Sequence, residues 1–69
     1  MVKFDTIGKI IEGTNAGWYI KIIDDNKKSG GVFIYEFPEI NGSEGFDTWL
    51  ENPEDIPEFI NEKGWQIQW

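Results

Sequence analysis

Three segments of the chain have the character of strands, two of them with a period of two (residues 18–23 and 65–69), and these segments constrain the fold more than any other feature of the sequence. Residues 18–23, 32–37 and 65–69 are rich in β-branched and aromatic side chains, which favour strands. A period of two sends alternate side chains to opposite faces of a strand. We therefore expect three strands, with the faces that carry Trp18 and Trp65 turned toward the core.

Turn-forming residues separate these segments and delimit two further strands. Residues 4–12 predict a first strand, weakened or bulged by Gly8, and residues 46–51 can also be extended. Clusters of glycine, asparagine, aspartate and serine predict turns or loops at residues 13–17, 24–31 and 41–45. Connections this short favour an antiparallel meander.

One helix is predicted between the last two strands. Asp55 and Glu58 have the spacing of a capping box, and Gly64 follows the last periodic residue, as is typical of a helix C-terminus. Three apolar residues share one helical face: Ile56, Phe59 and Ile60. The sequence therefore predicts a single α+β domain over residues 1–69, an antiparallel meander sheet of four to five strands with one short helix packed on one face.

The composition excludes most catalytic chemistry. The chain has 69 residues with no cysteine and no histidine, so it lacks disulfides, thiolate metal sites and the common nucleophile and base pairs. Ser29 beside Lys28, and the carboxylate pairs of residues 24/25 and 47/51, are better interpreted as solvated side chains. Residues 24–30 do not match a calcium-binding loop, because Lys28 occupies a ligand position. We expect no enzymatic activity, no cofactor and no metal.

Charge is distributed unevenly along the chain. The formal net charge is -7, from thirteen Asp and Glu against six Lys, and residues 36–69 hold nine of the acids but only one lysine. Such an acidic surface accelerates association with a basic partner and imitates the charge of a nucleic acid, although acidity can also serve solubility alone. We predict partner contacts by Asp47, Glu51, Glu54, Asp55, Glu58 and Glu62, with Trp49 as an apolar anchor.

The same charge limits the kinds of partner and the location. An acidic protein repels phosphate backbones, so we expect no nucleic acid to bind. Residues 1–5 contain no apolar run of signal-peptide length, and no stretch of about 18 apolar residues occurs. We therefore expect a cytoplasmic protein that does not interact with membranes.

Several of these segments together resemble a known class of proteins. They are residues 17–22, the Asp-rich turn that ends in Gly30 and Gly31, residues 45–51 ahead of the helix, and residues 65–69. Their size, acidity and tryptophan content are similar to those of small bacterial immunity proteins encoded beside polymorphic or contact-dependent toxins. The resemblance implies a non-catalytic protein that neutralises a cognate toxin, often a basic nuclease domain.

Two other functions remain open at this point. One is a phage-encoded antagonist of a host defence protein, which would mimic nucleic-acid charge by the same physics. The other is a structural or assembly subunit whose tryptophan-rich sheet pairs with itself or with a larger complex. The expected oligomeric state is a monomer or a weak homodimer.

Overall fold

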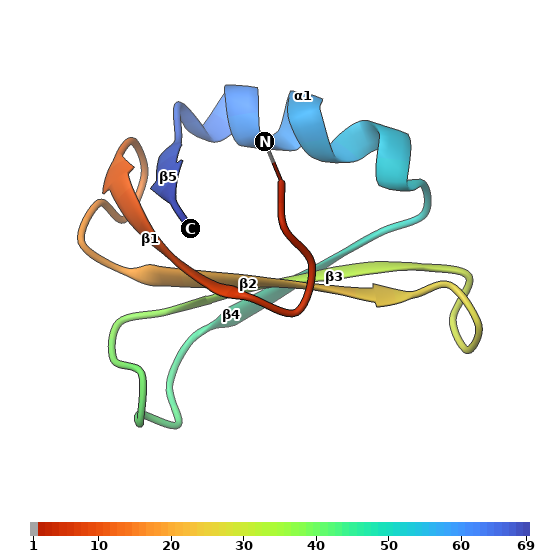
Figure 1. The fold of residues 1–69 in the computed structure, drawn as a ribbon, viewed down its shortest axis with the longest axis horizontal. Coiled ribbons are helices and arrows are strands. Elements are labelled where there is room, and N and C mark those ends of the chain that lie inside the picture. The colour runs from red at the N-terminus through yellow and green to blue at the C-terminus, as the bar shows by residue number, and fades with distance from the viewer. Residues whose placement is uncertain (1) are drawn as a thin grey trace.

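The computed structural model describes residues 2–69 as an α+β fold, as the sequence predicts. A five-stranded antiparallel sheet forms one layer, and a short helix lies over one of its faces (Figure 1). The elements, in chain order, are β1 (Ile7–Glu12), β2 (Tyr19–Asp25), β3 (Gly31–Phe37), β4 (Phe46–Leu50), the 3-10 turn η1 (Pro53–Asp55), α1 (Ile56–Lys63) and β5 (Gln66–Gln68).

The strands β1 to β4 form the predicted meander, and β5 is added at its other edge. The spatial order is β4-β3-β2-β1-β5, with every neighbouring pair antiparallel. The first strand is shorter than the predicted residues 4–12, because Asp5 adopts a positive φ of 55°. Phe4 instead forms an isolated parallel bridge to Ile22. The predicted strand at residues 46–51 is confirmed as β4.

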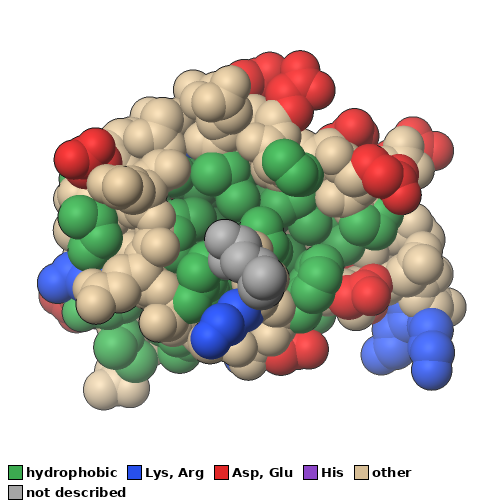
Figure 2. Space-filling view, turned by 45° about the horizontal axis from the view of Figure 1, so that its top comes forward, with side chains coloured by type: hydrophobic (Ala, Val, Ile, Leu, Met, Phe, Trp, Pro, Cys, Tyr) green, Lys and Arg blue, Asp and Glu red, His purple; other side chains and the backbone are tan. Residues whose placement is uncertain are grey.

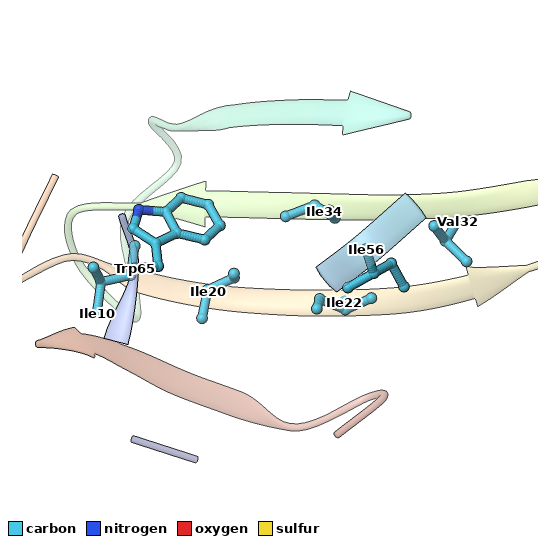
Figure 3. Close-up of a cluster of buried hydrophobic side chains, with 7 residues drawn as sticks. All are labelled: Ile10, Ile20, Ile22, Val32, Ile34, Ile56 and Trp65. Atoms are coloured by element: carbon cyan, nitrogen blue, oxygen red, sulfur yellow. The ribbon is translucent and has the colours of Figure 1, made fainter. Parts of the chain in front are cut away.

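The core lies between the sheet and α1, on what we call the helix face of the sheet (Figure 3). Because side chains alternate along a strand, every second residue of β2 and β3 points to this face. Ile56 of the helix lies beside Ile22 and Val32. The fully or nearly fully buried apolar residues are Ile10, Ile20, Ile22, Val32, Ile34, Ile56 and Trp65. The predicted inward direction of the Trp18 and Trp65 faces is confirmed, since Trp18 also packs against this cluster.

The helix begins differently from the prediction. Asp55 is itself in the right-handed helical region, and its side chain makes no capping hydrogen bond, so the capping box with Glu58 is wrong. The turn η1 precedes the helix directly, and the Asp55 N–H donates to the Asn52 carbonyl. An extended N-cap residue is what allows a side chain to reach the first free amides, and the 3-10 turn removes that geometry here.

The end of the helix is joined to the β1–β2 turn. Gly64 ends α1 in the left-handed conformation with a φ of 66°, as predicted. The Thr14 N–H donates to the Lys63 carbonyl at 3.0 Å, and the Trp65 indole N–H donates to the Thr14 carbonyl at 2.7 Å. Gly13 permits this close approach, because a Cβ there would lie 2.5 Å from the Gly64 carbonyl oxygen. These bonds fix the position of α1 over the sheet.

Candidate protein-binding surfaces

Five of the seven predicted contact residues lie in one stretch of chain between β4 and the end of α1. We call them the acidic ridge: Glu51, Glu54, Asp55, Glu58 and Glu62. All five side chains are exposed. Figure 2 shows acidic side chains at the top and upper right of the view, and others at the left and lower edge, around a central apolar area. Five of the six predicted acidic contacts are thus exposed within one segment of twelve residues, 51–62.

Helical spacing explains how the ridge is formed. Asp55, Glu58 and Glu62 are separated by three and four residues, so they follow one another along the solvent side of α1. The opposite side of the helix carries Ile56, which is 2% exposed, and the half-buried Phe59. The pairing of α1 with the core therefore forces the carboxylates outward.

Not every carboxylate of the ridge can be explained by helix stability. Acids in the first turn, such as Glu58, interact favourably with the positive end of the helix dipole. Glu62 lies in the last turn, where a carboxylate opposes the dipole, and it is four residues from Glu58, where like charges repel. Neighbouring Lys63 directs its ammonium group to the Phe59 ring, 5.4 Å from the centroid. Glu62 therefore opposes helix stability through both the helix dipole and its repulsion with Glu58.

Asp47 and Trp49, the other two predicted contacts, lie on the opposite face of the sheet. They pair with Tyr35 and Phe33 of β3, which alternate with the buried residues of the helix face. Trp49 is 44% exposed, and its indole N–H donates to the Ser29 hydroxyl at 2.9 Å. The structure separates this tryptophan from Glu58 and Glu62 of α1, which lie across the sheet.

Glu36 does not belong to the acidic surface, although the sequence places it in the acid-rich half. It is only 3% exposed, because it occupies a helix-face position of β3 in phase with Val32 and Ile34. One of its carboxylate oxygens accepts a hydrogen bond from the Asn15 side chain at 3.2 Å. The pattern of apolar residues in β3 does not predict that Glu36 is buried, because a carboxylate is normally expected at the surface.

The face of the sheet that α1 leaves uncovered, here called the open face, is the surface that sequence reasoning missed. Its side chains are mainly apolar: Ile7, Ile11, Tyr19, Ile23, Phe33, Tyr35, Phe37 and Trp49, with Lys9, Lys21, Asp25 and Asp47 among them. Ile7 and Ile11 are 43% and 47% exposed. The signal was present in the sequence, because both phases of these strands are apolar, as in sheets covered on both faces.

Aromatic contacts organise the open face. Phe33 stacks on Tyr35 with 5.9 Å between ring centroids, and Tyr19 stacks on Phe37 at 6.0 Å. The Lys9 ammonium lies 5.9 Å from the Tyr19 ring centroid. Stacked rings of this kind form a rigid apolar surface that loses little conformational entropy when a partner covers it.

A shallow hollow marks one end of the open face. The loop between β3 and β4 extends to the side of the sheet away from α1 (Figure 1), and the hollow beside it has a volume of about 390 Å³. Its lining includes Lys21, Tyr35 and Asp47 from the strands and Ile40 from the loop. A positive charge, a negative charge and an aromatic ring thus lie together at this end of the open face.

Ser29, which was considered as a catalytic residue, is held in hydrogen bonds within the fold. Ser29 lies in the β2–β3 turn, where its hydroxyl accepts from the Trp49 indole and donates to the Asp25 carbonyl.

Within residues 2–69 no cluster of three or more acidic side chains is arranged to hold a metal ion. Within the same residues no helix is both long and apolar enough to cross a membrane.

Comparison with known proteins adds no further information on the site. No protein-family model, no curated protein and no solved structure matches this chain. The functional argument therefore depends on the surfaces described above.

Proposed function

We propose that this protein is a non-catalytic inhibitor that docks its acidic ridge on a basic protein partner, in the manner of an immunity protein that neutralises a toxin or nuclease domain. The observation that carries the proposal is the gathering of five exposed carboxylates between residues 51 and 62. Fields from such a surface raise association rates and select partners of opposite charge. The resemblance of the sequence to small acidic immunity proteins supports the same function.

The cost of Glu62 favours this function over acidity that serves solubility alone. A solubilising charge can be placed anywhere on the surface, whereas Glu62 opposes the helix dipole and repels Glu58. Like charges four residues apart destabilise a helix by about 0.2–0.5 kcal/mol. Retaining such a pair is understandable if both carboxylates contact a partner.

The test compares capture of a basic partner by two variants of equal charge. The first, E58Q/E62Q, removes two carboxylates from the ridge. The control, E39Q/E44Q, removes two exposed carboxylates from the β3–β4 loop, on the other side of the sheet. Each tagged protein is used to capture partners from cells of the source organism, at low salt and at 1 M salt, where the Debye length is about 3 Å.

We expect the wild type and E39Q/E44Q to retain one basic protein at low salt and to release it at 1 M salt. The affinity of E58Q/E62Q for that protein should fall about 5- to 30-fold, as expected for losing roughly 1–2 kcal/mol of charge interaction. Thermal melting should show that E58Q/E62Q is at least as stable as the wild type. Equal binding by both variants, or no basic partner at either salt concentration, would refute the proposal.

A further inference from the structure

We infer that the outer edge of β4 accepts an extended segment of a partner protein, which adds to the sheet as a further strand and carries basic side chains alternating with apolar ones. This surface meets the acidic ridge only at Glu51, and the inference does not depend on the proposed inhibitory function. Three observations carry it: the free backbone groups of the edge, the exposed aromatic rings beside it, and the negative charge around it.

The backbone of β4 is paired on one side. Within residues 2–69, β4 pairs with β3 alone, and Figure 3 shows it as the outermost strand on that side of the sheet. Natural proteins normally protect such an edge with lysine, proline or a β-bulge. Residues 46–50 contain neither lysine nor proline, and their register with β3 is continuous. The edge is therefore open to a further strand.

The direction of the backbone groups follows from one hydrogen bond at the other side of β2. The Ile22 carbonyl accepts from the Asp5 N–H at 2.8 Å, so the backbone groups of Ile22 point away from β3. Opposite residues of an antiparallel pair either exchange both hydrogen bonds or both point away from each other. Ile34 is the partner of Ile22 in β3, so its N–H and C=O point toward β4. There they meet Thr48, the partner of Ile34 in β4.

The free groups of the edge belong to Asp47 and Trp49. Thr48 directs its N–H and C=O toward β3, and successive residues of a strand alternate in this direction. The Leu50 carbonyl, in phase with Thr48, agrees with this assignment, because its oxygen would lie 2.3 Å from a Cβ on Gly31 of β3. The N–H and C=O groups of Asp47 and Trp49 therefore point outward, where an added strand can bond to them.

Exposed aromatic rings lie beside this edge on both faces of the sheet. Trp49 is 44% exposed on the open face, and Phe46 is 60% exposed on the helix face. Phe46 stacks on Trp18 with 5.8 Å between ring centroids, and the Trp49 indole donates to the Ser29 hydroxyl of the β2–β3 turn. An added strand would cover apolar area on both faces while its main chain pairs with β4, which is the way peptides bind to sheet edges.

The charge around the edge selects a basic segment. Glu44, Asp47 and Glu51 are exposed before, within and after β4, and residues 36–62 contain nine acids and no lysine. Two copies of β4 paired with each other would bring these carboxylates together, which disfavours a second copy of this chain at the edge. A segment with basic side chains would instead meet opposite charges.

The register of the sheet specifies where these side chains lie. One row across the sheet reads Lys21, Tyr35, Asp47, and its next position belongs to the added strand, where a basic side chain would face Asp47. In the row of Trp49, two residues away, an apolar side chain would lie beside the indole. Glu51, two residues further, favours a second basic side chain. The expected segment therefore carries a basic, an apolar and a basic side chain at alternate positions.

The experiment uses synthetic peptides with blocked ends, titrated against the protein and followed by backbone amide NMR. The probe TKVITKV has the expected pattern, and TEVITEV is its acidic counterpart. A third peptide has the probe sequence with N-methyl groups on the isoleucine and the second lysine, whose N–H groups would bond to the Trp49 and Asp47 carbonyls. The matched control carries its N-methyl groups on the second threonine and the last valine, whose N–H groups would point to solvent.

We expect TKVITKV to bind with a dissociation constant below about 1 mM. TEVITEV and the peptide methylated on isoleucine and lysine should bind at least about tenfold more weakly, whereas the control peptide should stay within about threefold of the probe. Asp47→Lys should weaken binding of the probe at least about tenfold, and Glu39→Lys, an equal change of charge in the β3–β4 loop, by no more than about threefold. The ridge variant E58Q/E62Q should bind the probe within about threefold of the wild type, so the two proposals can fail separately.

Amide hydrogen exchange on the unmodified protein covers the case in which a variant does not fold. Without peptide, the N–H groups of Asp47 and Trp49 should exchange faster than those of Thr48 and Leu50, and bound TKVITKV should slow the first two. No binding of TKVITKV at 1 mM, or equal binding of the two methylated peptides, would overturn the proposal. Slow exchange of the Asp47 and Trp49 amides without peptide would also overturn it, because the edge would then already be paired with a second copy.

Discussion

The assignment of the two sheet faces can be tested with one matched pair of substitutions in β1. Ile10 and Ile11 are neighbours of the same type, but Ile10 is completely buried on the helix face, whereas Ile11 is 47% exposed on the open face. Replacing either by alanine removes the same three carbon atoms. The difference in stability between the two variants therefore measures the difference between the two faces.

The expected losses follow from burial. Removing three buried carbons costs about 2.4 kcal/mol of transfer free energy, at roughly 0.8 kcal/mol each, and the cavity raises the total for Ile10→Ala to about 3–5 kcal/mol. Ile11 loses about half of that transfer free energy and leaves no closed cavity, so Ile11→Ala should cost about 1 kcal/mol. The reduced strand propensity of alanine affects both variants alike.

These values are large on the scale of this small protein. A chain of 69 residues has a free energy of unfolding of roughly 3–10 kcal/mol, so Ile10→Ala removes a large share of it. At about 4–8 °C per kcal/mol, Ile10→Ala should lower the melting temperature by more than about 12 °C, and Ile11→Ala by no more than about 8 °C.

The assay is urea unfolding followed by tryptophan fluorescence. Near-UV circular dichroism on the native baseline verifies that each variant is folded before unfolding. Equal losses, or a larger loss for Ile11→Ala, would refute the face assignment, because a register shift by one residue exchanges the two faces of a strand.

Two further predictions concern the contact of β1 with Trp69 and the contact of Trp65 with the β1–β2 turn. In Gly8→Ala the new Cβ would lie 2.8 Å from the Trp69 ring. Overpacking should therefore lower the free energy of unfolding by about 1–3 kcal/mol and increase the quenching of tryptophan fluorescence by acrylamide. Unchanged stability and quenching would contradict the contact between Gly8 and Trp69. Trp65→Phe removes the hydrogen bond to the Thr14 carbonyl and part of the core. The free energy of unfolding in urea should therefore fall by about 2–4 kcal/mol. A fall of less than about 1 kcal/mol would show that this hydrogen bond does not hold the end of the helix.

The local features of the fold were predictable because they depend on short-range physics. Alternation in residues 18–23 specifies a strand with one buried face, and the β-branched and aromatic side chains of residues 32–37 specify another, since such side chains favour extended backbone. The glycine after Lys63 specifies the helix end, because glycine adopts the left-handed conformation at little cost. The start of the helix was predicted wrongly, because the turn η1 depends on backbone geometry that side-chain spacing does not encode.

The candidate site was only partly predictable for the same reason. Helical spacing was enough to place Glu58 and Glu62 on one exposed side, and strand phase was enough to separate Trp49 from Trp65. Sequence spacing could not show that Asp47 and Trp49 lie across the sheet from Glu58 and Glu62. That relation depends on which face of β4 the helix covers, and both faces of the neighbouring strand are apolar.

The sequence by itself therefore determined the strands, the helix, their order and the exposure of the helix acids Glu58 and Glu62, because each follows from periodicity and backbone preference within a few residues. Only the tertiary structure decided which sheet face is covered. With one eight-residue helix and a sheet that is apolar on both sides, one face is necessarily left uncovered, and burial of Ile56 and Trp65 against the helix face leaves Phe33, Tyr35 and Trp49 on the other. The same choice carries Glu36 into the core and places Glu58 and Glu62 on the side opposite the open face.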